Sequence, residues 1–306
     1  MKKLYLSGAM FDALPVQEHL TAAAANGYAG IQVRSTHLTP ETPADVRESI
    51  CCFAEKHNLK INALSCFIGN FALLPDAGCE EALTKLLAYA GLAAAVNAPL
   101  IRVWPGWIES GKADAALLKH TAKWLKIAAD RAGELGIGLA MEMHHGTLLD
   151  CIDGAERLLE EVEKNNVGLI FDPVNLYQTG TYYGADAIRR IADRIFDVHV
   201  KDIILLQDDT ESGCFAYSYY ATHIGRFTKV VPPDAVSERY YAHRRIGLGG
   251  VDWHSVLTGL ERCGYNGSFT VESVRENCCC LPEGGQLAAL CAKDWNALQA
   301  VRGGAV

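Results

Sequence analysis

Three acidic residues and one histidine each stand at the end of a short apolar run, and together they suit a metal ion. They are Glu142, Asp172, His199 and Glu272. Any one of them alone is as consistent with a helix cap or an ion pair with arginine. Four that converge in apolar surroundings would be unfavourable unless a cation held them. We therefore predict a divalent-metal site. Three oxygen donors and one nitrogen leave two octahedral positions open, which favours Mn²⁺, with Mg²⁺, Co²⁺ or Zn²⁺ as alternatives.

These residues belong to a regular alternation of apolar runs and helical patterns. Several runs, such as residues 167–171, are apolar throughout, which is typical of parallel strands covered on both faces. Eight such alternations without a linker predict a single (β/α)₈ TIM barrel over residues 1–306, with its active site at the carboxyl ends of the strands. A doubly wound sheet would have a glycine-rich turn after the first strand, and residues 4–13 lack one. The predicted strands are Leu4–Gly8, Tyr28–Arg34, Lys60–Phe67, Pro99–Trp104, Gly136–Met143, Val167–Asp172, Arg194–Lys201 and Gly267–Ser273.

One long segment, Ile203–Arg245, interrupts this alternation after the seventh strand. It has no helical period. Loops after a barrel strand lie on the catalytic face, so we predict that residues 203–245 form a lid or a partner-binding insertion. An oligomer interface is the alternative. The aromatic residues of the segment are Phe215, Tyr217, Tyr219, Tyr220, Phe227, Tyr240 and Tyr241.

Charge and cysteine content indicate which partners and which cellular compartment to expect. The formal net charge is −8, which disfavours nucleic acid as a partner. The 11 cysteines are odd in number and contain no C-x-x-C pair, so we predict reduced thiols, a cytoplasmic location and no cysteine ligands to the metal. No apolar stretch approaches the roughly 18 residues that a membrane span requires, and no membrane association is expected.

The motifs around these residues resemble those of the xylose isomerase-like family of sugar isomerase and epimerase barrels. The resemblance covers nearly the whole chain and rests on residues 139–144 (LAMEMH), 171–175 (FDPVN), 198–202 (VHVKD) and 247–253 (GLGGVDW). In that family a Glu, an Asp, a His and a Glu at the ends of strands five to eight hold the metal. Those positions fall on the four residues named above. Asp252, in the last motif, is expected to cap the helix that follows, and the glycines before it to allow a substrate to approach closely.

Such a site supports removal of a proton beside the carbonyl of a keto sugar. Glu142 and Glu272 could present carboxylates to opposite faces of the reacting carbon and exchange general-base and general-acid roles. His144, two residues after Glu142, is expected to share its face as a further acid/base group, while His145 points away. Lys201 is expected to polarise a substrate oxygen. The alternatives are a packing role for His144 and a surface salt bridge for Lys201.

The sequence favours two reactions that follow this proton removal about equally. The first is isomerisation or epimerisation of a keto sugar through a metal-bound enediolate. The alternative is the catalytic subunit of a C-glycoside deglycosidase, a carbon–carbon lyase that eliminates an aromatic aglycone from a 3-keto C-glycoside and works with a smaller subunit. The aromatic segment suits that alternative, and oligomerisation is expected in either case. A non-enzymatic sugar-binding barrel and a DNA-repair endonuclease are the remaining hypotheses, and the negative charge disfavours the latter.

Overall fold

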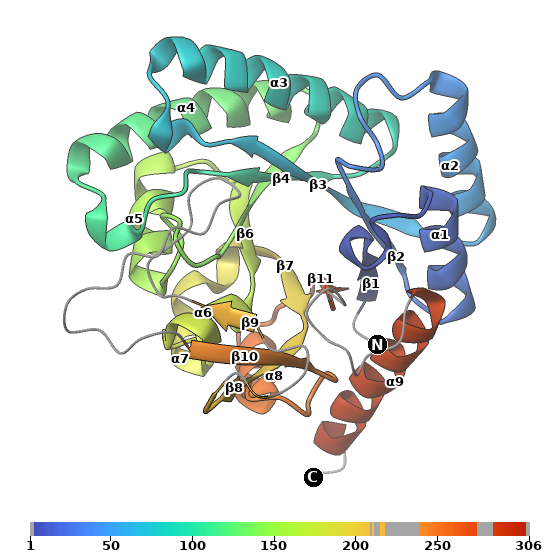
Figure 1. The fold of residues 1–306 in the computed structure, drawn as a ribbon. Coiled ribbons are helices and arrows are strands. Elements are labelled where there is room, and N and C mark those ends of the chain that lie inside the picture. The colour runs from blue at the N-terminus through green and yellow to red at the C-terminus, as the bar shows by residue number, and fades with distance from the viewer. Residues whose placement is uncertain (1–2, 209, 211–214, 218–238, 274–283, 304–306) are drawn as a thin grey trace.

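Eight parallel strands close into a barrel in the computed structural model, which describes residues 3–208, 210, 215–217, 239–273 and 284–303 (Figure 1). Around the barrel the strands follow the order β1-β11-β7-β6-β5-β4-β3-β2. Each strand overlaps one of the predicted runs, so the prediction of a TIM barrel is confirmed. The strands are β1 Lys3–Ser7, β2 Gly30–Arg34, β3 Lys60–Gly69, β4 Leu100–Trp104, β5 Gly138–Glu142, β6 Val167–Phe171, β7 Ile195–Val200 and β11 Ser268–Val271.

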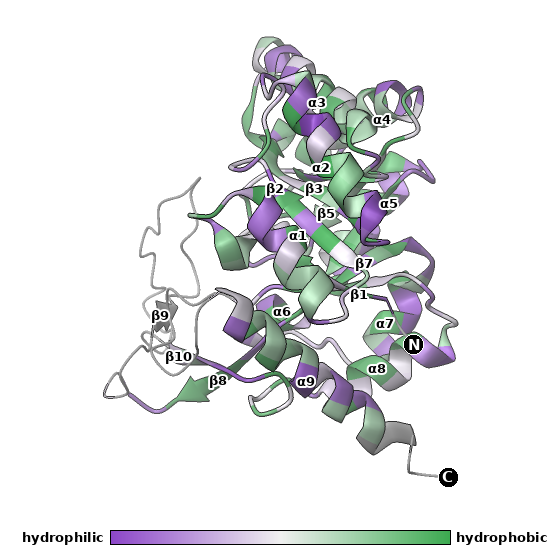
Figure 2. Ribbon diagram, turned by 90° about the vertical axis from the view of Figure 1, so that its right-hand side faces the viewer, coloured by the Kyte–Doolittle hydropathy of each residue, from purple (hydrophilic) through white to green (hydrophobic). Residues whose placement is uncertain are grey.

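Helices surround the barrel and cover its outer side (Figure 1). On α5 the buried residues include Ile152, Ala155 and Leu159, whose spacing of three or four places them on one helix face. Hydrophilic residues occupy other positions of the same helix (Figure 2). None of the helices in the described part of the chain has the length and apolar character needed to cross a membrane. The helices are α1 Val16–Ala25, α2 Ala44–Lys56, α3 Asp76–Ala95, α4 Ala115–Gly133, α5 Ile152–Val162, α6 Pro173–Thr179, α7 Ala185–Ile191, α8 Trp253–Arg262 and α9 Gly284–Gly303.

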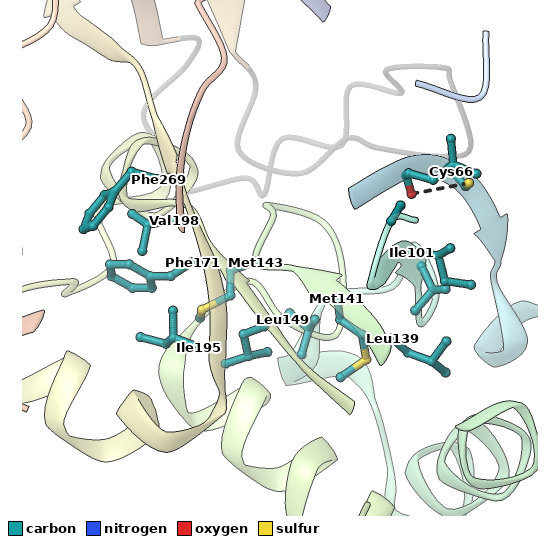
Figure 3. Packing of buried hydrophobic residues seen from close by; sticks show 14 of the residues in the cluster. Cys66, Ile101, Leu139, Met141, Met143, Leu149, Phe171, Ile195, Val198 and Phe269 are labelled. Carbon is teal, nitrogen blue, oxygen red and sulfur yellow. Dashed lines mark hydrogen bonds between the residues drawn. The ribbon is translucent and has the colours of Figure 1, made fainter. Parts of the chain in front are cut away.

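Alternate side chains of the barrel strands face the helices and the barrel interior. Met141, Phe171 and Val198 lie in the apolar core that the strands share with the helices (Figure 3). Successive side chains of a strand point to opposite faces, so Glu142 and His199, next to core residues, point into the barrel. Because the apolar residues of each strand face the helices, the polar residues between them point into the barrel and converge there.

The segment after β7 forms a small antiparallel sheet. The sheet consists of β8 Asp202–Leu206, β9 Phe215–Tyr217 and β10 Arg239–Arg244, in the order β8-β10-β9. It projects from one end of the barrel (Figure 2). Tyr241 of β10 is buried, and its hydroxyl donates to the backbone oxygen of Gln178 at 2.8 Å. Tyr219, Tyr220 and Phe227 lie outside the described residues, and a lid or partner surface stays a prediction.

Asp202, the first residue of β8, anchors the glycine-rich loop that precedes α8. Its carboxylate accepts hydrogen bonds from the backbone N–H groups of Gly247 (2.9 Å), Gly249 (3.2 Å) and Val251 (3.3 Å). A side chain at Gly249 would collide with this carboxylate, and one at Gly250 would collide with Tyr177. The glycines therefore allow close contact with protein groups.

Asp252 caps α8 as predicted, because its Oδ1 accepts from the Ser255 N–H at 2.9 Å.

Asp202→Asn is expected to lower the free energy of unfolding by roughly 2–3 kcal/mol, because the amide NH2 group would replace one of the two oxygens and leave the backbone N–H groups that bind it without an acceptor. Burial raises the pKa of Asp202 to about 6, against the backbone donors of Val251 and Gly249, which lower it. Urea denaturation at pH 8 would measure the ionised form. Asp252→Asn is the matched control, because Asn caps helices as well as Asp does. Equal stabilities of the two variants would contradict this assignment.

A buried histidine links the loop after β1 to α1. His19 is fully buried, and its Nε2 lies 3.1 Å from the backbone oxygen of Phe11. The ring of His37 lies edge-on at 4.4 Å between centroids. Burial, and secondly the neighbouring His37, lower the pKa of His19 to about 4. His19 is therefore neutral in the folded protein at pH values where the unfolded chain would protonate it.

The stability of the protein should consequently fall as the pH is lowered from about 6.5 towards 4. In this window the unfolded chain binds a proton that folded His19 does not, so acid favours unfolding by roughly 2–3 kcal/mol from this residue. Comparing urea denaturation at pH 7 and pH 4.5 in wild type and His19→Gln would isolate the effect. The control His254→Gln, at an exposed position, should retain the wild-type pH dependence. An unaltered pH dependence in His19→Gln would disprove the assignment.

Candidate metal centre

The four predicted ligands meet at the carboxyl ends of four adjacent strands. Glu142 is the last residue of β5, Asp172 follows β6, His199 lies near the end of β7, and Glu272 follows β11. Each offers one ligand atom, and these atoms lie within 4.8 Å of one another. Nδ1 of His199 lies 3.2 Å from Glu272 Oε2, 3.5 Å from Asp172 Oδ2 and 3.7 Å from Glu142 Oε1. All four side chains are buried, with at most 9% of the residue surface exposed.

Asp172 combines two roles that looked like alternatives in the sequence. Its Oδ1 accepts from the N–H groups of Val174 (3.0 Å) and Asn175 (3.1 Å), so it caps α6. Its Oδ2 faces His199 instead. The cap fixes the rotation of the carboxylate, which directs the second oxygen at the cluster.

Two basic side chains form ion pairs with the carboxylates. Nζ of Lys201 lies 2.6 Å from Asp172 Oδ2 and 3.0 Å from Glu272 Oε2. Nη1 of Arg102 lies 2.5 Å from Glu142 Oε2. Lys201 is 8% exposed, so the alternative of a surface salt bridge was wrong and the ion pair is a buried one.

The basic neighbours determine the protonation states of the two glutamates and of His199. Burial alone would raise the pKa of both glutamates, but Arg102 and then His199 outweigh it for Glu142, and His199 and then Lys201 outweigh it for Glu272. The pKa of each carboxyl group is therefore held below its ordinary value. Burial would lower the pKa of His199, and Glu272 and Glu142 outweigh it, so the pKa of the imidazole is raised. The carboxylates thus attract positive charge at the position of His199 Nδ1.

The residues present fit a divalent cation. Three carboxylates and an imidazole nitrogen are the donor set of Mn²⁺ and Zn²⁺ sites. Within the described ranges, neither ring nitrogen of His199 has a hydrogen-bond partner in the protein, although both are buried. A buried polar atom without a partner is costly, and a metal bound to Nδ1 would satisfy it.

His144 lies beside the centre and against two tryptophans. Its ring is edge-on to Trp104 (5.4 Å) and Trp107 (5.3 Å). Its Nδ1 donates to the backbone oxygen of His145 at 2.9 Å. Burial lowers the pKa of His144 more than the charge of Glu142 raises it, so a neutral imidazole is favoured. His145 is buried, with its ring 3.8 Å from that of His144. Because β5 ends at Glu142, the strand alternation expected to turn His145 away does not extend to it.

Three residues beside the centre were not predicted from the sequence. The guanidinium of Arg102 lies over Trp104, 4.9 Å from its ring centroid. Nδ2 of Asn175 donates to Glu142 Oε1 at 3.2 Å. His243 of β10 is 7% exposed, and burial and the charge of Lys201 lower its pKa to about 4. Arg102 could have been found as the one charged residue in the apolar run 100–104. His243 carried no local signal.

Curated relatives match about half of the chain. The rhizopine catabolism protein MocC of Rhizobium meliloti is 32% identical over 151 residues, which are 48% of this chain and 40% of that protein. Inosose dehydratase of Geobacillus thermodenitrificans is 27% identical over 148 residues, 48% of this chain and 44% of that protein. The aligned region thus spans less than half of each of these relatives.

Solved structures of similar fold cover nearly the whole chain. The probable 3-DHS dehydratase AsbF from Bacillus anthracis aligns with a TM-score of 0.73 and 17% identity, over 97% of this chain and 99% of that one. The IOLI protein, crystallised with a zinc atom, aligns with a TM-score of 0.72 and 19% identity, over 98% and 97%. At these identities the likeness concerns the fold.

A match to a family profile over most of the chain identifies the family. The profile described as xylose isomerase-like TIM barrel matches residues 20–293, which include all four residues of the metal centre. The chain therefore belongs to the xylose isomerase-like TIM-barrel family.

Proposed function

We propose that this protein is a divalent-metal-dependent enzyme that removes a proton beside the carbonyl of a keto sugar, giving isomerisation or epimerisation. The observation that supports the proposal most directly is that each of the two glutamates forms an ion pair with a different basic side chain. Glu142 is bound to Arg102, and Glu272 to Lys201. Both carboxylates are therefore held in the ionised form that a general base requires. A divalent cation, for which Mn²⁺ is our first choice, would supply Lewis acidity towards the carbonyl oxygen.

The remaining residues have roles that follow from their contacts. Oε1 of Glu142 and Oε2 of Glu272 lie 3.7 Å and 3.2 Å from His199 Nδ1. The glutamate that removes the proton from carbon becomes protonated and can return that proton to the neighbouring carbon, which gives isomerisation; for epimerisation the other glutamate would first take up a proton from water and then deliver it to the opposite face. Lys201 would donate to a substrate oxygen next to the reacting carbon. His144, neutral and flanked by tryptophans, would accept or donate a proton at a neighbouring hydroxyl.

Loss of water from the substrate is a third possible outcome of the proton removal, besides isomerisation and epimerisation. Dehydration of a ketone that carries a β-hydroxyl group can begin with the same proton removal. The relatives named as dehydratases give this outcome weight.

A second candidate function is the catalytic subunit of a C-glycoside deglycosidase. A cavity of about 480 Å³ is lined by residues of α6 and the loop after it, of β8 and β10, and of the start of α8, and its walls suit an aryl group. The four candidate metal ligands are not among its lining residues. This function also predicts association with a smaller subunit. The aromatic residues that line the cavity are Tyr177, Tyr182, Tyr183 and Tyr241.

One experiment separates these reactions. The protein is stripped with a chelator, reloaded with Mn²⁺ in deuterated water, and mixed with 2-ketohexoses, cyclic polyol ketones and an aryl 3-keto C-glycoside. Deuterium incorporation without loss of a hydroxyl group supports isomerisation or epimerisation. An enone product indicates dehydration, and a free phenol indicates the lyase. Absence of deuterium and of products in the whole panel, with metal bound, would overturn the proposal.

A further inference from the structure

A polar cluster fills the barrel interior beneath the metal centre. Asp197 lies two residues before His199 on β7, so both side chains point into the barrel. The carboxylate of Asp197 is fully buried and accepts three hydrogen bonds. Ser268 Oγ donates to Oδ1 at 2.7 Å, Thr270 Oγ1 donates to Oδ2 at 2.7 Å, and Gln32 Nε2 donates to Oδ2 at 3.2 Å. The charge is thus held by neutral donors from two strands, β11 and β2.

The register of the strands places this cluster directly below two metal ligands. In the pairing of β11 with β7, Ser268 is opposite Asp197 and Thr270 is opposite His199. Glu272 continues the same face of β11 two residues further. TIM-barrel interiors are ordinarily filled by branched apolar side chains. A buried polar cluster is less favourable than apolar packing unless every member is satisfied, so its presence here calls for a function.

Three buried atoms around this cluster have no hydrogen-bond partner in the described part of the protein. They are Nε2 of His199, Oε1 of Gln32 and Oδ1 of Asn62. The two amides reach the same carboxylate oxygen, because Gln32 binds Asp197 Oδ2 directly and Asn62 Nδ2 donates at 3.0 Å to Thr270, which binds Oδ2. Asp197 and His199 stand two residues apart on the same face of β7, so the carboxylate and the ring are neighbours.

The chemistry of these atoms matches one water molecule. When Nδ1 of His199 faces the carboxylates as a ligand, Nε2 carries the ring hydrogen and is a donor. The two amide oxygens are acceptors. A water molecule can accept one hydrogen bond and donate two, which is the set of partners that one donor and two acceptors require. A bound cation would be repelled by the Nε2 hydrogen.

We propose that Asp197 is a positioning residue that holds His199 in its metal-binding orientation through a water bound between the imidazole Nε2 and the Asp197 cluster. Histidines that bind metals generally donate their other ring N–H to a carboxylate, a carbonyl or a water, which fixes the tautomer and the ring orientation. Asp197, held in turn by Thr270 and Gln32, would fix both for His199. The inference rests on the metal site of the proposed function and is independent of the reaction.

Metal affinity tests the positioning role. Asp197→Asn and Thr270→Val should each weaken the binding of Mn²⁺ and Zn²⁺, measured by chelator competition, by about 10–100-fold. The matched control is Thr121→Val, which removes a buried hydroxyl on α4 that donates to the backbone oxygen of Leu117 at 2.8 Å, outside the cluster. This control should bind metal within about threefold of wild type. Wild-type affinity in Asp197→Asn, together with a lower melting temperature, would show a purely structural cluster and overturn the proposal.

The tautomer of His199 provides a readout that a structural role would not change. In zinc-loaded wild type labelled with ¹⁵N-histidine, NMR should show metal at Nδ1 and a slowly exchanging hydrogen at Nε2. In Asp197→Asn that hydrogen should exchange at least about tenfold faster. Metal at Nε2 of the wild-type ring would overturn the proposal even if the variants failed to fold. Both readouts use metal alone, so a failure to turn over keto sugars would reject the proposed function without affecting this test.

Discussion

Replacing Glu272 by glutamine is expected to weaken metal binding by more than about 100-fold. Loss of a residue that only supports a ligand weakens binding by about 10–100-fold, whereas this change removes a charged ligand itself. The rate of proton exchange on a keto sugar should fall by about 10²–10⁴-fold, the contribution of a general base. Fold stability should change little, because Lys201 retains its contact with Asp172 at 2.6 Å. Elemental analysis, chelator competition and deuterium exchange measure the three quantities.

Two further variants make this prediction specific. Glu134→Gln removes an exposed carboxylate at the end of α4 and should leave metal binding and exchange unchanged. Glu142→Gln should abolish exchange as Glu272→Gln does, but it should also destabilise the protein, because Arg102 then faces a neutral amide in a buried site. Full metal occupancy with wild-type exchange in the Glu272 variant would remove that residue from the site.

The barrel could be predicted because its signal is local. A run such as Val167–Phe171 is apolar at every position, and each residue is buried in the structure. Strands covered on both faces have this composition, whatever their partners. The ends of the strands were predicted to within about two residues, since strand ends depend on pairing with neighbours, as for Gly69, which extends β3 by pairing with Trp104.

The four candidate ligands could be predicted because the topology of the fold brings them together. Once the strands are parallel and adjacent, their carboxyl ends meet, and polar side chains at those ends converge. Arg102 could not be assigned in the same way. A single arginine in an apolar run is consistent with a strand end at the surface, and only the contact between β4 and β5 places it on Glu142.

The segment after β7 shows the limit of local patterns. Its strands pair across long stretches of chain, with His243 opposite Ile203 and Tyr240 opposite Leu206. No periodicity along the sequence encodes such a pairing. Tyr241, which was grouped with the aromatics of the predicted lid or partner-binding insertion, is buried and binds the backbone of Gln178 on α6.

Arg102→Met is expected to lower the free energy of unfolding of the metal-free protein by about 3–5 kcal/mol, the cost of leaving one partner of a buried ion pair uncompensated. Arg102 is 4% exposed, and its guanidinium is the cation that contacts Glu142 Oε2 at 2.5 Å. Asn175 would still donate to Oε1, but an amide carries no charge. Urea denaturation of chelator-treated protein at pH 7 would measure the loss.

Added metal should restore part of this stability, which separates the electrostatic role of Arg102 from its packing. A divalent cation bound by Glu142 replaces the missing positive charge and stabilises the folded state by mass action. Arg157→Met is the control, because Arg157 lies at an exposed position and donates to the backbone oxygens of Ser110 (3.5 Å) and Ala113 (3.2 Å). Its loss should be smaller, and metal should stabilise it no more than wild type. If Arg102→Met lost less than about 1 kcal/mol, or if its loss were the same with and without metal, the guanidinium would act by packing against Phe67 and Trp104 and the charge assignment would be wrong.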